Sequence, residues 1–155
     1  MPRHWLFKSE PGVYSIDDLA RDGSTGWDSV RNFQVRNFLR DEIRPKDRVL
    51  FYHSSSEPPG VAGLALVVKP GYPDLSAQDP ASDHYDEKAT PEEPRWYQVD
   101  LAFEEKFARL VPLRELATAP GLEEMLVHRK SRLSIQPVTA EEFRIVVGLG
   151  RKRHG

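Results

Sequence analysis

Three strand-like segments in the middle of the chain constrain its fold more than any other feature. They are residues 49–53, 63–68 and 96–107, and each is rich in the aliphatic and aromatic side chains that favour strands. A further strand is predicted at residues 4–9 and a short one at residues 132–135. Strands gathered in the centre of a short chain predict one sheet rather than alternating strand–helix units.

Helical segments flank these strands. Ser15 is a natural N-cap for a short helix, and Asp17 and Asp18 suit the positive end of its dipole. Other helices are expected at residues 34–43, 113–116, 122–128 and, after a capping box from Thr139 to Glu142, 139–147. The order of elements predicts an α+β fold, a small mixed β-barrel flanked by short helices.

The length and composition exclude several classes of protein. The chain has 155 residues, which predicts one compact domain over residues 1–150, followed by a basic tail at residues 151–155. It has no cysteine, which excludes disulfides, a cysteine nucleophile and thiolate zinc sites. No two of its five histidines are four residues apart, so no metal is expected. Without an apolar run of about 18 residues or a signal-like N-terminus, we expect no membrane association and a cytoplasmic protein, nuclear in a eukaryote.

Motifs for common catalytic chemistry are missing. The chain has no Gly-x-Ser-x-Gly nucleophile elbow and neither of the glycine-rich nucleotide loops. His53 precedes three serines, but adjacent residues of a strand face opposite sides. Residues 70–95 hold five prolines and seven acidic residues without the spacing of a calcium loop, and a long surface loop is predicted there. We therefore expect a binding module without a cofactor rather than an enzyme.

Charge is unevenly distributed along the chain. The net charge is −2, yet acidic residues dominate residues 55–105 and basic residues dominate residues 106–155. The near-neutral total argues against a protein that coats DNA irrespective of sequence. A local basic patch and an ordinary surface of ion pairs both remain compatible with this pattern.

Trp27 stands out because it lies in a loop-like segment where the local pattern requires no large ring. Polar residues that suit nucleic acid follow it: Arg31, Asn32, Gln34, Arg36 and Asn37. Amides match base edges, guanidinium groups match phosphates, and tryptophan offers a stacking face. The alternative, that Trp27 fills the core and the polar run is a solvated helix face, fits the sequence equally well.

Polar residues also end two of the predicted strands. The first strand closes with Lys8-Ser9-Glu10 and a central one with Tyr52-His53-Ser54. In a small barrel the ends of adjacent strands form the mouth of a pocket, and Tyr85 in the acidic segment could close over a ligand. The alternatives are a buried Tyr52 and a merely exposed Tyr85.

Several blocks across nearly the whole chain resemble EVE-domain proteins. The blocks are Trp5-Leu6-x-Lys8-Ser9-Glu10-Pro11, Tyr14-Ser15-Ile16-x-Asp18-Leu19, Trp27-x-x-Val30-Arg31-Asn32-x-Gln34-x-Arg36-Asn37-x-Leu39-Arg40, Phe51-Tyr52-His53-Ser54, Pro59-Gly60-Val61-Ala62-Gly63, Tyr72-Pro73-Asp74, His84-Tyr85-Asp86, Trp96-x-x-Val99-Asp100 and Arg132-Leu133-Ser134-Ile135-Gln136-Pro137. The resemblance implies a PUA-like fold, related to the YTH domain, with an aromatic pocket for a modified base. The implied ligand is a modified cytosine in DNA, with RNA as an alternative.

The same resemblance implies roles for individual residues. The base pocket would comprise Lys8, Ser9, Glu10, Trp27, Asn32, Tyr52, His53, Ser54 and Tyr85. Phosphates would contact Arg31, Arg36 and Arg40. Two positions depart from the family pattern. The pattern has an acidic or polar residue followed by glycine, and here Asp28 is followed by Ser29; Phe33 occupies a position where tyrosine is common. An enzyme acting on modified nucleosides, with His53 and Glu10 as acid and base, and a small-ligand-binding domain remain the alternatives.

Overall fold

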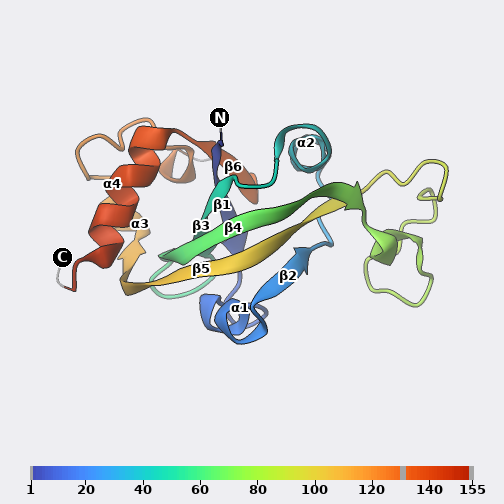
Figure 1. Cartoon of the computed structure of the whole chain (residues 1–155), viewed down its shortest axis with the longest axis horizontal. Coiled ribbons are helices and arrows are strands. Elements are labelled where there is room, and N and C mark those ends of the chain that lie inside the picture. The colour runs from blue at the N-terminus through green and yellow to red at the C-terminus, as the bar shows by residue number, and fades with distance from the viewer. Residues whose placement is uncertain (1, 130–131, 154–155) are drawn as a thin grey trace.

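The computed structural model describes residues 2–129 and 132–153, and its centre is a six-stranded mixed sheet (Figure 1). The strands are β1 (His4–Ser9), β2 (Ser24–Trp27), β3 (Arg48–His53), β4 (Gly60–Pro73), β5 (Tyr97–Pro112) and β6 (Ile135–Val138). Their order across the sheet is β2-β5-β4-β3-β1-β6. The β1–β3 pair is parallel and the other four pairs are antiparallel. The predicted α+β class is confirmed.

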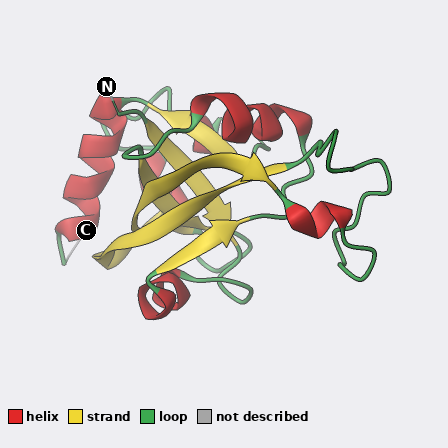
Figure 2. Cartoon of the chain, turned by 45° about the vertical axis from the view of Figure 1, so that its right-hand side comes forward, coloured by secondary structure: helices red, strands yellow, loops and turns green. Residues whose placement is uncertain are grey.

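Short helices surround the sheet (Figure 2). They are α1 (Ile16–Asp22), α2 (Phe33–Asn37) with the π-helical turn η1 (Phe38–Glu42), the 3-10 helix η2 (Leu75–Gln78), α3 (Leu113–Leu116), the 3-10 helix η3 (Leu126–His128) and α4 (Ala140–Arg151). Ser15 is the N-cap of α1 and Thr139 opens the capping box of α4, as predicted, and Ser15 also forms a complete capping box with Asp18. No helix of the described residues is long and apolar enough to cross a membrane.

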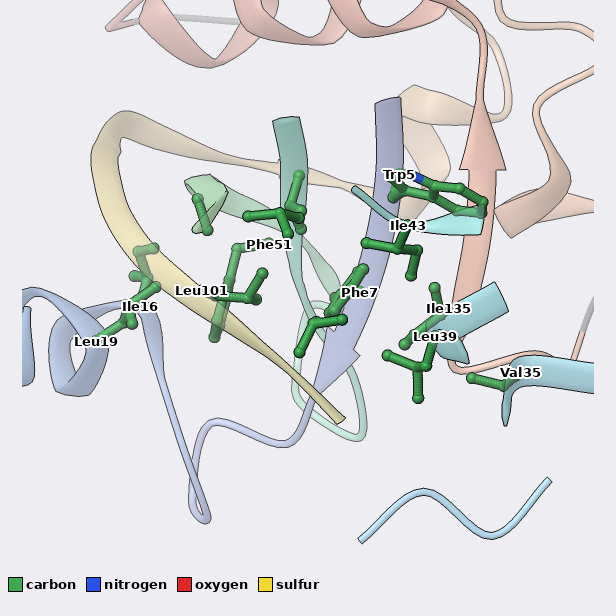
Figure 3. Close-up of a cluster of buried hydrophobic side chains, with 14 of the residues drawn as sticks. Trp5, Phe7, Ile16, Leu19, Val35, Leu39, Ile43, Phe51, Leu101 and Ile135 are labelled. Carbon is green, nitrogen blue, oxygen red and sulfur yellow. The ribbon is translucent and has the colours of Figure 1, made fainter. Parts of the chain in front are cut away.

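The sheet packs a hydrophobic cluster on each face. Alternation along β1 places Trp5 and Phe7 in one cluster, against side chains from α1, α2 and η1 (Figure 3), and Leu6 in the other. In the second cluster Leu6 packs with Leu50 and with residues of α4 such as Phe143. Because β1 and β3 are parallel and in register, their carboxyl ends meet at one edge of the sheet.

Strand boundaries differ from the predictions where pairing decides them. Residues 24–27 form β2 instead of a loop because they pair with β5, so Trp27 ends a strand. The last strand lies at residues 135–138 rather than 132–135, since Ile135 pairs with Phe7 of β1. β4 continues to Pro73, and the long surface loop therefore spans residues 74–96.

Helix boundaries differ as well. The predicted helix at residues 34–43 begins at Phe33 and changes into the π-helical turn at Phe38. Only residues 126–128 of the predicted helical segment 122–128 are helical. Arg151 belongs to α4 and pairs with Glu105 at 2.8 Å, while His154 and Gly155 of the predicted tail lie outside the described residues.

Candidate ligand-binding cavity

A cavity of about 670 Å³ opens where β1 and β2 end. Its lining comes from four parts of the chain: the end of β1 and the turn after it, the end of β2 and the segment that leads to α2, the long loop, and the residue before β6. These residues are Lys8, Ser9, Glu10, Val13, Tyr14, Thr25, Gly26, Trp27, Asp28, Ser29, Val30, Arg31, Asn32, His84 and Ser134. The volume falls within the usual range for small-ligand pockets.

Trp27 forms the aromatic wall of this cavity. Its ring meets Phe7 edge-on at a centroid distance of 5.4 Å and Phe51 at 5.6 Å. These two rings belong to the buried core, so they fix the indole in one orientation (Phe7 and Phe51, Figure 3). Trp27 itself is only half-buried. The core thus holds a ring whose remaining surface faces the cavity.

The end of β1 supplies a polar wall. The Ser9 hydroxyl donates to the Tyr14 carbonyl at 2.5 Å, which ties the strand end to the following turn. The Glu10 carbonyl accepts the backbone N–H groups of Val13 and Tyr14, so the turn is closed by its own backbone. Lys8 is half-buried, and that burial lowers the pKa of its ammonium group. A ligand in the cavity would therefore meet a hydroxyl and a partly desolvated ammonium group.

The opposite wall, residues 28–32, is anchored by Asp74. This carboxylate is fully buried and accepts the Ser29 N–H at 2.8 Å, the Ser76 N–H at 2.9 Å and the Arg31 guanidinium at 3.1 Å. Burial alone would raise the pKa of Asp74, but the hydrogen bonds from Ser76, Ser29 and Arg31 outweigh it and hold the pKa below 3.8. Ser29 has φ +66°, which explains why glycine suits this position.

Arg31 joins the long loop to the cavity. Its Nε and Nη2 atoms donate to the His84 carbonyl at 3.2 and 2.6 Å, which brings His84 to the cavity wall. The predicted phosphate ligand Arg31 is therefore engaged inside the protein. Asn32 lines the cavity while its side-chain oxygen caps α2 by accepting the Val35 N–H at 3.0 Å.

Four predicted pocket residues do not line the cavity: Tyr52, His53, Ser54 and Tyr85. Tyr52 is 4% exposed and packs with Leu50 on the other face of the sheet, where burial raises the pKa of its phenol. Ser54 binds the end of β1 through its backbone, donating to the Ser9 carbonyl. Tyr85 is 44% exposed and follows His84, the loop residue that does reach the cavity.

His53 caps a helix rather than facing the cavity. Its Nε2 atom accepts the backbone N–H of Ile16, the first residue of α1, at 3.1 Å. Burial lowers the pKa of His53 below its ordinary value of 6.5, Asp17 opposes this shift and Lys106 adds to it. An imidazole that accepts at Nε2 must be neutral, which agrees with a lowered pKa.

We predict that this cap makes the fold sensitive to acid. Because the folded pKa is depressed, the stabilisation is present above pH 6.5 and is lost as the pH falls through the folded value. Urea unfolding between about pH 7 and pH 5 is expected to show a falling free energy of unfolding, and His53→Ala is expected to flatten part of that fall. The same slope in His53→Ala and the unaltered protein would contradict the assignment. His4, whose pKa is lowered by burial and by Arg48, accounts for some remaining slope.

The other two predicted phosphate ligands lie outside the cavity lining. Arg36 donates to the Arg95 carbonyl at 2.6 Å and to the Asn37 side chain at 2.9 Å. Arg40 pairs with the adjacent Asp41 at 2.8 Å.

Sequence reasoning missed several lining residues. Those with side chains suited to ligand contact are Tyr14, Thr25, His84 and Ser134. Tyr14, His84 and Ser134 lie within the blocks that resemble EVE-domain proteins, whereas Thr25 carries no local signal. Across residues 2–129 and 132–153, no group of three or more histidine or acidic side chains could hold a metal ion.

Comparisons with known proteins give close relatives. The profile of the EVE domain matches residues 3–149. Thymocyte nuclear protein 1 of Homo sapiens is 41% identical over 168 residues, which cover 96% of this chain and 74% of the human protein. The chain is thus similar to most, but not all, of that protein's length.

Solved structures agree with the sequence comparisons. A hypothetical protein from Leishmania major superposes with a TM-score of 0.93 at 41% identity, covering 100% of this chain and 98% of that one. The crystal structure of human THYN1 protein in complex with 5-methylcytosine containing DNA superposes with a TM-score of 0.87 at 41% identity, covering 97% of this chain and 98% of that one. The PUA-like arrangement of strands and helices is therefore shared almost from end to end.

Proposed function

The chain belongs to the EVE-domain family, and from this premise we propose that it is a DNA-binding module that holds a modified cytosine in the cavity beside Trp27. The observation that carries the proposal is the fixed indole at the wall of an open cavity of about 670 Å³. A base stacked on Trp27 would turn its polar edge toward Ser9 and Asn32. The human relative in complex with 5-methylcytosine containing DNA supports this choice of ligand.

The arrangement favours binding over catalysis. Hydrolysis of a modified nucleoside would need an acid and a base at the reacting bond, and Glu10 and His53 were the candidates. Glu10 lines the cavity, but His53 does not, and its Nε2 atom is occupied by the Ile16 N–H. This pair is therefore not assembled around a ligand in the cavity. We propose a reader without turnover.

Energetics predict which DNA binds best. Extruding a base from a duplex costs a few kcal/mol, whereas stacking on an aromatic ring contributes roughly 1–3 kcal/mol. The two quantities nearly cancel, so edge contacts decide whether a fully paired site is bound. We expect single-stranded or mismatched sites to bind more tightly than a paired duplex.

The proposal is tested by fluorescence anisotropy with short labelled oligonucleotides. Plain, methylated and hydroxymethylated cytosine would be compared in DNA and RNA, single-stranded and duplex, at two salt concentrations. We expect one modified DNA base to bind best, with affinity that falls as salt rises. Equal binding of all bases, or binding that does not respond to salt, would overturn the proposal. Release of free base or altered nucleoside during incubation would establish the enzyme instead.

A further inference from the structure

An exposed aromatic ring, Phe33, lies beside the cavity and is not part of its lining. Phe33 directly follows Asn32, which lines the cavity, and it is 50% exposed. It is one of the few large hydrophobic side chains of the described chain that are exposed to this extent. Such a ring serves the core poorly, because half of its surface remains in water.

The ring is nevertheless held rigidly. It stacks on Trp96 with a centroid distance of 4.7 Å and an interplanar angle of 24°. Trp96 is 5% exposed, and its indole N–H donates to Asp86 at 2.7 Å. Burial and this hydrogen bond hold the Trp96 ring in place beneath Phe33. The guanidinium of Arg31, which lines the cavity, lies 5.4 Å from the Trp96 ring. The stacked pair is therefore a fixed platform at the cavity rim.

Positive charge surrounds this platform. The guanidinium groups of Arg36 and Arg95 lie over the Phe33 ring, 4.9 Å and 5.4 Å from its centre, and the ring still keeps half of its surface exposed. Arg95 is paired with Asp86, but Arg36 has no carboxylate within 4.0 Å among the described residues. Burial lowers the pKa of the Arg36 guanidinium, the neighbouring Arg40 cation adds to this shift, and Asp41 opposes it. An exposed aromatic ring beside an arginine without a carboxylate partner among the described residues fits the alternating bases and phosphates of a nucleic-acid strand.

We propose that Phe33 and Arg36 bind the nucleotide next to the one in the cavity, with Phe33 stacked on its base and Arg36 on its phosphate. The inference rests on the proposed function, because it takes DNA to be the ligand of the cavity. It adds a second contact that is indifferent to base modification. Trp27 would supply the preference for a modified base, and the platform would supply affinity for the strand that carries it.

The test uses three short single-stranded DNAs, each with one central 5-methylcytosine. The first is intact, the second has an abasic site directly 5′ of the methylcytosine, and the third has an abasic site directly 3′ of it. Phe33→Leu is expected to weaken binding of the intact DNA about 5- to 150-fold, equally for methylated and plain cytosine. With one of the two neighbouring bases removed, Phe33→Leu should have little further effect, as in a double-mutant cycle. An equal loss on all three DNAs would overturn the stacking contact.

Arg36→Gln tests the phosphate contact independently. The affinity of Arg36→Gln is expected to fall less steeply with salt: the negative slope of log affinity against log salt becomes shallower by about 0.7, the value for one phosphate on a single strand. The matched control is Arg114→Gln, an exposed arginine on α3, which lies apart from α2 beside α4 (Figure 1), and this change should leave the slope unaltered. Equal slopes for Arg36→Gln and the unaltered protein would overturn the contact. If the unaltered protein binds no DNA, the proposed function itself fails, and the two failures are thus distinguishable.

Discussion

Replacing Trp27 with alanine is expected to weaken binding of DNA with 5-methylcytosine about 5- to 150-fold and to abolish its preference over plain cytosine. The reason is the loss of one stacking contact, worth roughly 1–3 kcal/mol, from the wall that holds the base. Fluorescence anisotropy of labelled DNA measures this directly and does not depend on the emission of the remaining tryptophans. A variant that keeps the preference would show that the base lies elsewhere.

The same substitution also removes a ring that packs on Phe7 and Phe51, so its effect on folding must be separated. Trp27→Phe keeps an aromatic ring at the wall and is expected to retain part of the preference. Tyr85→Ala is the matched control, because Tyr85 is an exposed aromatic side chain of the adjoining loop outside the cavity lining. Urea unfolding of each variant establishes that it is folded under the binding conditions.

Asp74→Ala is expected to lower the free energy of unfolding by about 3 kcal/mol. The substitution leaves the Ser29 and Ser76 N–H groups without their acceptor and removes the carboxylate that pairs with Arg31, whose side chain is only 25% exposed. Urea unfolding gives the size of the loss, and amide hydrogen exchange at Ser29 reports its local part. Glu87→Ala, an exposed acidic residue of the same loop, is expected to change stability by less than about 0.5 kcal/mol.

The pH dependence of the free energy of unfolding provides a second test of the role of Asp74. Because the folded pKa of Asp74 is depressed, its contribution is present at neutral pH and is lost as the pH falls below 3.8. Asp74→Asn, which has no charge to titrate there, is expected to lose less stability over that interval than the unaltered protein. Equal acid sensitivity of the two proteins would mean that Asp74 does not hold the wall.

Much of the fold could be predicted because its signals are local. The aliphatic and aromatic residues at 4–9, 49–53 and 96–107 are frequent enough to predict strands, and the capping box from Thr139 to Glu142 lies within four consecutive residues. The short strand β2 could not be predicted, because it has only four residues, includes Gly26, a residue type depleted in strands, and is held by its pairing with β5. The last strand was predicted at residues 132–135 but lies at residues 135–138, because these residues pair with β1.

The cavity was predicted only in part, because some of its lining residues carry a local signal in the sequence and others do not. The polar end of β1 and the unexplained Trp27 are visible in the sequence, and both line the cavity. Tyr52 lies two residues after Leu50 along β3, so both side chains face the second cluster. The sequence does not show that Trp27 lies on the opposite face of the sheet, and Tyr52 was therefore wrongly placed in the pocket. Asp74 and His84 reach the site from a distant loop through Arg31, and no local pattern indicates such a contact.

The pairing of β6 with β1 has a consequence for synthesis on the ribosome. Within this domain β1 is the first strand to be translated, whereas β6, its outer neighbour, and α4, which packs beside Leu6 and Leu50, come last. A nascent chain that ends before residue 135 therefore presents an open strand edge and an uncovered apolar face together. Such surfaces are bound by chaperones and are prone to aggregate.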